Sequence, residues 1–99
     1  MIQPIPCVKF RDASTKEWME KLAEETEEVL GEADLINLDL DGIIRNRQIN
    51  EHLAEELTDV ITVCVSWLDA LGYDEDERNE WQRRVNEKNR LRGYHEAAQ

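Results

Sequence analysis

The chain has 99 residues and a mass of 11.6 kDa, enough for one domain, because a second hydrophobic core would need roughly another hundred residues. With 23 acidic against 12 basic residues, its net charge of −11 argues against binding to nucleic acid or to an anionic membrane surface, both of which depend on clustered Lys and Arg. The sequence has no signal-peptide pattern, no uncharged run near the roughly 20 residues of a membrane span, and only two cysteines, so we expect a small acidic cytoplasmic domain.

The first half of the chain is predicted to begin irregularly and then to form a helix. Segment 1–13 is expected to be extended or irregular, because both prolines of the chain fall in its first six residues. Ser14 and Glu17 have the spacing of a capping box and predict a helix start, and Gly31 is predicted to end that helix. The following stretch, 32–42, fits a short helix or a strand, and we favour the helix.

The second half of the chain is predicted to form two more helices. After a connecting loop at 43–48, the range Asn50–Leu71 has a helical pattern with a capping residue at its start and a glycine directly after its end. Asp74 or Asp76 can cap a fourth helix, which is predicted to run to Arg92.

These elements predict an all-α fold, a helical bundle of three to four helices per chain. The helical domain covers 14–93 and is followed by a tail at 94–99. The helix at 50–71 has an unusually wide apolar arc and should therefore be the central helix of the bundle. Because short helices of one chain can hardly cover such an arc, we expect the bundle to be completed by oligomerisation.

A first pair of carboxylates falls beside the apolar stripe of the helix that begins at Ser14. Glu25 borders this stripe, and Glu28 follows it by one turn, further towards the outside. Glu24 and Glu27 form a competing pair with the same spacing. A single E-x-x-E pair on a helix is usually solvated surface, so the pair alone does not indicate function.

A second pair of carboxylates is more informative because it lies within an apolar surface. Glu56 falls inside the wide apolar arc of the helix at 50–71, and Asp59 lies at its edge. A buried carboxylate must be protonated, meet a cation or bind a metal, and this helix contains no Lys or Arg. Two such pairs on facing helices would offer four hard oxygen ligands, which Mg²⁺ prefers.

Three blocks of the sequence share motifs with one group of enzymes. Lys21–Val29 (KLAEETEEV) is similar to a K-L-x-E-E-x-x-E-V block, and Glu55–Val60 (EELTDV) resembles an E-E-L-x-D-V block. Asn86–Tyr94 (NEKNRLRGY) resembles an N-x-K…R-G-Y ending. The chain thus resembles the MazG-like nucleotide pyrophosphohydrolases of the all-α NTP pyrophosphatase superfamily, over nearly its whole length.

The resemblance implies a Mg²⁺-dependent hydrolase that cleaves a nucleoside triphosphate to the monophosphate and pyrophosphate by water attack at the α-phosphorus. Carried over position by position, it implies that Glu25, Glu28, Glu56 and Asp59 are both the ligands of the ion and the catalytic residues. Mn²⁺ is an alternative ion, and a homodimer or homotetramer is expected for such a family. The base, the sugar and the carboxylate that accepts the proton of water stay open.

Two basic residues near the end of the chain are the candidates for binding substrate phosphates. The resemblance implies that Lys88 and Arg92 neutralise phosphate charge. They share one helical stripe with Trp81 and Val85, so we expect them on the packing face of the fourth helix.

Two alternative functions remain beside the enzymatic one. A non-catalytic acidic interaction module would spread its acids over exposed faces, which the place of Glu56 among apolar residues disfavours. A degenerate family member that binds nucleotides without cleaving them would keep the same four carboxylates. Trp18 and Trp67 flank the acidic positions on their helices, and we expect them in the core rather than stacked on a nucleobase.

Overall fold

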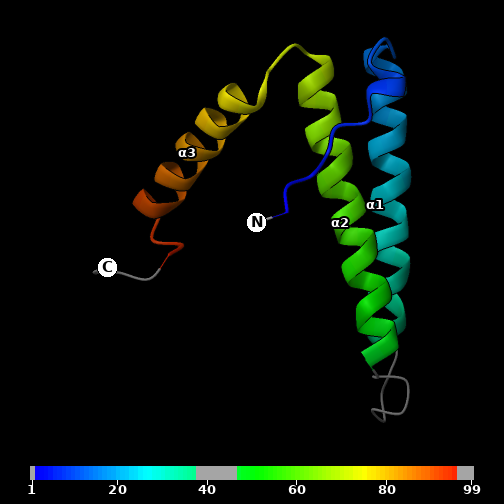
Figure 1. Cartoon of the computed structure of the whole chain (residues 1–99). Coiled ribbons are helices and arrows are strands. Elements are labelled where there is room, and N and C mark those ends of the chain that lie inside the picture. Colours follow the sequence, from blue (N-terminus) through cyan, green and yellow to red (C-terminus); the bar gives the residue numbers. More distant parts are fainter. Residues whose placement is uncertain (1, 38–46, 96–99) are drawn as a thin grey trace.

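The computed structural model of the chain describes residues 2–37 and 47–95 (Figure 1). These ranges contain no strand, so the predicted all-α class is confirmed. None of the helices in them is both long and apolar enough to cross a membrane. Their elements in chain order are a 3₁₀ turn, η1 (Val8–Phe10), and the helices α1 (Thr15–Asn37), α2 (Arg47–Ala70) and α3 (Glu75–Leu91).

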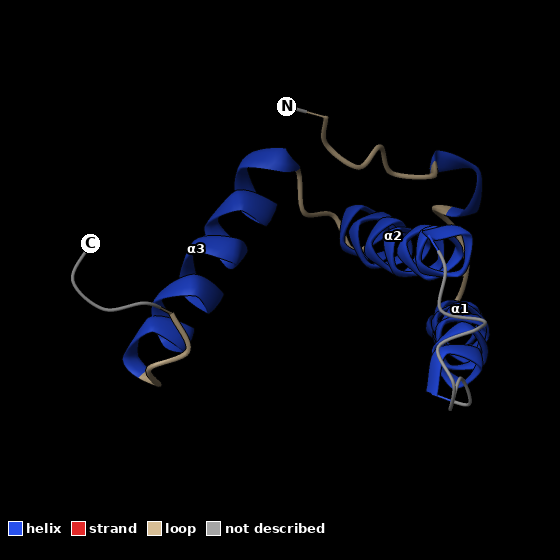
Figure 2. Ribbon diagram, turned by 90° about the horizontal axis from the view of Figure 1, so that it is seen from below, coloured by secondary structure: helices blue, strands red, loops and turns tan. Residues whose placement is uncertain are grey.

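Helices α1 and α2 form an antiparallel pair that runs side by side over most of their length (Figures 1 and 2). The buried apolar side chains of the described residues are Trp18 on α1 and Val63 on α2. The rings of Trp18 and Trp67 stack across this pair with centroids 6.2 Å apart and an angle of 10° between their planes. The core therefore sits at the end of the pair where α1 begins and α2 ends.

The start of α1 is fixed by the predicted capping box. The amide of Glu17 donates to Ser14 Oγ at 3.2 Å, and the amide of Ser14 donates to Glu17 Oε1 at 3.1 Å. The pKa of Glu17 is lowered, first by the bond from the Ser14 amide to the carboxylate and then by the Ser14 hydroxyl, because both favour the charged form. The helix start at Ser14 is confirmed.

The predicted end of the first helix at Gly31 is wrong, because α1 continues through this glycine to Asn37. A glycine ends a helix by turning to positive φ, and among the described glycines only Gly72 and Gly93 do so. Of the predicted short helix, residues 32–37 belong to α1, and 38–42 lie outside the described residues. Likewise α2 begins at Arg47, inside the predicted loop, whose residues 43–46 are not described.

Replacing Gly31 with alanine is expected to stabilise the protein by about 0.5–1 kcal/mol, because glycine weakens a helix interior by that amount. A methyl group added there meets nothing within 4 Å, so no clash offsets the gain. Chemical denaturation of the two proteins would measure the difference. An unchanged or lower free energy of unfolding would contradict a continuous helix at this position.

The N-terminal segment lies on the side of α2 away from α1, so α2 has a neighbour on two sides, as expected of a central helix (Figure 2). The backbone amide of Cys7 donates to Ser66 Oγ at 2.9 Å, and this hydroxyl donates to the Thr62 carbonyl oxygen at 2.7 Å. Ser66 is thereby buried with its polar atom satisfied. The predicted irregular segment thus holds one short 3₁₀ turn and is attached to α2 through its backbone.

A short elbow joins α2 to α3. Gly72 adopts a φ of +98°, and the amides of Gly72 and Tyr73 donate to the carbonyl oxygens of Asp69 and Leu68, which is the pattern of a Schellman motif. Asp74 then caps α3 with a capping box to Glu77, so the predicted cap at Asp74 is confirmed. Beyond the elbow, α3 extends away from the α1–α2 pair (Figures 1 and 2).

Because α3 extends away, the wide apolar arc of α2 is not covered within one chain. Leu57 and Ile61 are about half exposed, at 47% and 52%. On α3, Trp81, Val85 and Leu91 are exposed as well. In the described part of the chain, two apolar surfaces therefore stay exposed, one on α2 and one on α3.

Candidate metal centre

The four acidic residues predicted to form the site come together between α1 and α2. Glu25 from α1 and Glu56 and Asp59 from α2 each offer a carboxylate oxygen, and these oxygens lie within 4.8 Å of one another. Glu28, which is exposed, joins them one turn along α1, where it lies within hydrogen-bonding reach of Glu56 and Glu25. We call these four residues the acidic cluster.

The competing pair on α1 lies outside the acidic cluster. Glu24 and Glu27 are both exposed, and Glu24 makes an ion pair with Lys21 at 3.8 Å. Each residue turns about 100° around a helix, so of two adjacent pairs with the same spacing only one can face α2. The structure selects Glu25 and Glu28.

Two carboxylate oxygens in the acidic cluster are buried without a partner. Glu25 is only 9% exposed, and its Oε1 makes an ion pair with Lys21 Nζ at 3.0 Å. The other oxygen of Glu25 and Oε2 of the half-buried Glu56 have no hydrogen-bond partner. A buried, unsatisfied oxygen of a charged group destabilises a fold by at least about 1–3 kcal/mol, and a bound cation would remove this penalty.

The four carboxylates repel one another, and the effect is visible at Glu28. The pKa of Glu28 is raised from 4.5 to about 7, first by the hydrogen bond to Glu56 and then by the negative charge of Glu25. Below about pH 7 Glu28 is therefore protonated, and a cation bound nearby would favour its charged form instead.

The raised pKa of Glu28 predicts that the metal-free protein loses stability as the pH rises. Between pH 4.5 and about 7, the folded state binds more protons than the unfolded state, so this contribution is full below pH 4.5 and is lost as the pH rises through about 7. Thermal unfolding in chelator from pH 5 to 8 should show a falling midpoint. Glu28→Gln should flatten this part of the profile, and equal slopes for both proteins would contradict the predicted coupling.

The acidic cluster fits a small divalent cation. Mg²⁺ binds oxygens at about 2.0–2.1 Å, so two ligands on opposite sides of the ion lie roughly 4.2 Å apart. Of three ligands of an octahedral ion at most one pair lies on opposite sides, and the other pairs lie about 3 Å apart. The carboxylate oxygens of Glu25, Glu56 and Asp59, which lie within 4.8 Å of one another, would close on the ion by shifts of about 1 Å each. The unpartnered oxygens on Glu25 and Glu56 are hard donors of the kind that this ion prefers.

The sequence interpretation missed Lys21 as the cation that supports Glu25. The helix that carries Glu56 has no Lys or Arg in 50–71, but Lys21 lies one turn before Glu25 on the other helix, α1. The hydrogen bond to Glu25 raises the pKa of Lys21 and keeps it charged. The i,i+4 spacing of Lys21 and Glu25 is the signal that could have revealed this pair.

The two predicted phosphate-binding residues stand apart from the acidic cluster within one chain. Lys88 and Arg92 are exposed and, together with Leu91, line a surface hollow of about 600 Å³ on α3. Their stripe was expected to be a packing face, but Trp81 and Val85 are about 40% exposed, because α3 packs along neither α1 nor α2 in the described part of the chain. The structure therefore brings the four acids together but not the two cations.

The tryptophans near the acidic cluster belong to the core. Trp18 is 5% exposed, which confirms its predicted place in the core, and Trp67 is half-buried against it.

No protein-family model, curated protein or solved structure matches this chain. The interpretation of the site therefore rests on its own residues and their geometry.

Proposed function

We propose that this chain is a Mg²⁺-dependent nucleoside triphosphate pyrophosphohydrolase of the MazG-like kind, which releases pyrophosphate after water attack at the α-phosphorus. The observation that carries the proposal is the pair of buried, unpartnered oxygens on Glu25 and Glu56, within reach of Asp59. Such oxygens on facing helices are suited to a hard cation, and a cation with carboxylate ligands and free positions is the usual partner of substrate phosphates.

The residues of the site have separate roles in this proposal. Glu25, Glu28, Glu56 and Asp59 would hold the ion, and the ion pair with Lys21 fixes the orientation of the Glu25 carboxylate. When bound, Mg²⁺ supplies a Lewis acid that neutralises phosphate charge and lowers the pKa of a coordinated water. Because the chain carries −11 overall, a triphosphate without a cation would be repelled from this surface.

Substrate phosphates need further cations, and the charge distribution suggests where they come from. Residues 78–92 carry six Lys or Arg against two Glu, a net charge of +4, so the rest of the chain carries −15. The whole of α3 is neutral, because its first turn holds three acidic residues, and the positive charge gathers towards its C-terminal end. Such a basic helix end, which stands away from the acidic pair in its own chain, is complementary to that pair in a second copy. We infer a homodimer, or a homotetramer of two dimers, in which Lys88 and Arg92 of one protomer approach the acidic cluster of the other.

If the protein self-associates through the exposed apolar residues of α2, a charge introduced at Ile61 should weaken that association. Replacing the half-exposed Ile61 with aspartate should shift the protein towards monomer, because a carboxylate would be buried in an apolar interface without a partner. Analytical ultracentrifugation over a range of concentrations measures this. Thr15→Asp, which makes the same charge change at an exposed position in the first turn of α1, should leave the association unchanged. A monomeric wild-type protein, or equal behaviour of both variants, would contradict the inference.

The deciding experiment for the proposed reaction is pyrophosphate release from a panel of standard and modified ribo- and deoxyribonucleoside triphosphates. Each nucleotide is tested with Mg²⁺, with Mn²⁺ and with chelator. Release that requires the metal and yields the monophosphate supports the proposal and identifies the preferred base and sugar. If no nucleotide is cleaved under any of these conditions, the enzymatic proposal fails and a binding role takes its place.

A further inference from the structure

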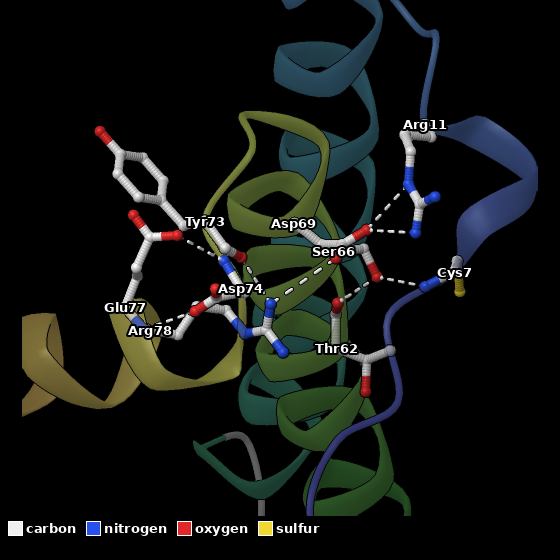
Figure 3. Close-up of polar contacts among 9 residues, drawn as sticks. All are labelled: Cys7, Arg11, Thr62, Ser66, Asp69, Tyr73, Asp74, Glu77 and Arg78. Atoms are coloured by element: carbon white, nitrogen blue, oxygen red, sulfur yellow. Dashed lines mark hydrogen bonds and ion pairs between the residues drawn. The ribbon is translucent and has the colours of Figure 1, made fainter.

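Asp69, near the C-terminal end of α2, connects three segments of the chain (Figure 3). Its Oδ2 accepts hydrogen bonds from Arg11 Nε at 3.1 Å and from Arg11 Nη2 at 2.9 Å, and its Oδ1 makes an ion pair with Arg78 Nη1 at 3.6 Å. Arg11 follows η1 in the N-terminal segment, and Arg78 lies in the first turns of α3. One carboxylate thus connects the N-terminal segment, α2 and α3.

The location of Asp69 on α2 is unfavourable by itself. It lies in the last turn of the helix, where the macrodipole disfavours negative charge, and α2 has no basic residue in that turn. Its side chain is only 19% exposed, and that of Arg78 only 16%. A shielded carboxylate at the end of a helix needs cations, and both of its cations come from other segments. This arrangement is more than a surface ion pair, which contributes little.

The pair between Asp69 and Arg78 spans the elbow that sets the direction of α3. Arg78 Nη1 also donates to the Tyr73 carbonyl oxygen at 2.6 Å, so the guanidinium is held on both sides of the turn. Within the elbow, the Schellman hydrogen bonds and the Asp74 capping box satisfy the backbone. Since α3 packs along neither α1 nor α2 within the described chain, its direction depends on these contacts and on the edge-to-face contact of Tyr73 with Trp81 (Figures 1 and 3).

A small change at the elbow becomes a large displacement at the end of α3. Arg92 lies 14 residues beyond Arg78, which is about 21 Å along a helix axis. A rotation of about 10° at the elbow would therefore move Arg92 by about 4 Å. Displacements of about 1 Å can already lower catalytic efficiency a hundredfold, so phosphate-binding residues on α3 need a fixed elbow.

We propose that Asp69 is a positioning residue: by holding Arg78 and Arg11 it fixes the direction of α3 and so sets where Lys88 and Arg92 meet substrate phosphates. This inference rests on the proposed function for its effect on catalysis. Its effect on the direction of α3 is independent of any reaction. Asp69 touches neither the acidic cluster nor the phosphate-binding residues, so it acts only through the arginines that it holds.

The first test measures the direction of α3 without substrate. Cys7 and Cys64, both free and exposed, are replaced by serine, and spin labels are attached at Glu55→Cys on α2 and Asn86→Cys on α3. The labelled protein is diluted with unlabelled protein so that only distances within a chain are measured. Asp69→Asn is expected to broaden or shift the distance distribution, and Asp69→Glu to restore most of it. An unchanged distribution in Asp69→Asn overturns the inference.

The second test uses kinetics on a nucleotide that the wild-type protein cleaves. Asp69→Asn should raise KM by about tenfold or more, with the Mg²⁺ dependence unchanged, because displaced phosphate-binding residues weaken substrate binding while the acidic cluster stays intact. Arg11→Gln, at an exposed arginine, removes one of the two contacts and should give an intermediate rise even if Asp69→Asn folds poorly. Glu20→Gln, which breaks an ion pair confined to α1, should change nothing.

The outcomes separate the two proposals. A lower kcat at unchanged KM, in proportion to a smaller folded fraction, would show a merely structural role for Asp69 and overturn the inference while the proposed function stands. A wild-type protein that cleaves no nucleotide defeats the proposed function. In that case the distance measurement alone decides whether Asp69 fixes the direction of α3.

Discussion

Replacing Glu56 with glutamine is expected to lower the rate of pyrophosphate release by at least about a thousandfold, because it removes a buried ligand oxygen from the acidic cluster. The same substitution should raise the unfolding temperature of the metal-free protein. Glutamine is nearly the same size, removes one of the crowded negative charges, and can donate its amide hydrogens to the carboxylates of Glu25 and Glu28. Loss of activity together with a gain in stability distinguishes a functional site from a structural one.

The experiment compares turnover at saturating Mg²⁺ and nucleotide with thermal unfolding in chelator and in Mg²⁺. Glu55→Gln is the matched control, because it makes the same charge change at the adjacent, exposed position of α2. Mg²⁺ should raise the unfolding temperature of the wild-type and control proteins and should do so much less for Glu56→Gln, since an ion that binds only the folded state stabilises it. Full activity in Glu56→Gln, or an equal loss in Glu55→Gln, would contradict the assignment.

The acidic cluster could be predicted from the sequence because helical periodicity places two pairs of carboxylates beside apolar faces, and the family resemblance favours Glu25 and Glu28 over the competing pair. Glu25 and Glu28 are one turn apart on a long helix, and Glu56 and Asp59 repeat the spacing on the next. Both helices have an apolar face, and two such helices joined by a short connection pack side by side. The apolar faces therefore turn both pairs of carboxylates towards each other.

The direction of α3 could not be predicted in the same way. It depends on the backbone dihedral angles of a short elbow and on the ion pairs of Asp69, whose partner Arg11 is 58 residues away in sequence. Helical periodicity in the sequence does not predict an ion pair between residues so far apart. Periodicity places Lys88 and Arg92 on one face at the end of α3, but it does not say what that face packs against.

The missed continuation of α1 through Gly31 has a related cause. Glycine both ends helices and occurs, at some cost in stability, inside them, and the local sequence is the same in the two cases. What decides is whether the residues beyond it gain by packing. In this chain, Ile36 is half-buried near the end of α1, and the α1–α2 pair extends past the glycine. Tertiary contacts thus override the local stop signal.

Replacing Trp18 with alanine is expected to destabilise the protein by about 3–5 kcal/mol, the usual effect of removing a large buried aromatic side chain. Trp18 is the larger of the two buried apolar residues in the described ranges, and its ring covers Trp67 across the α1–α2 pair. A domain of this size has roughly 5–15 kcal/mol of stability in total, so the loss should lower the unfolding midpoint by more than about 10 °C. Calorimetry or circular dichroism would measure the shift.

Trp18→Phe is the control that separates packing from polar interactions. The indole nitrogen of Trp18 is buried without a hydrogen-bond partner, so phenylalanine forfeits no hydrogen bond and keeps an aromatic ring against Trp67. We expect it to lose less than half as much stability as alanine. Equal losses in the two variants would mean that the indole N–H has a partner that the single chain does not provide. A negligible loss in Trp18→Ala would contradict the place of this residue at the centre of the core.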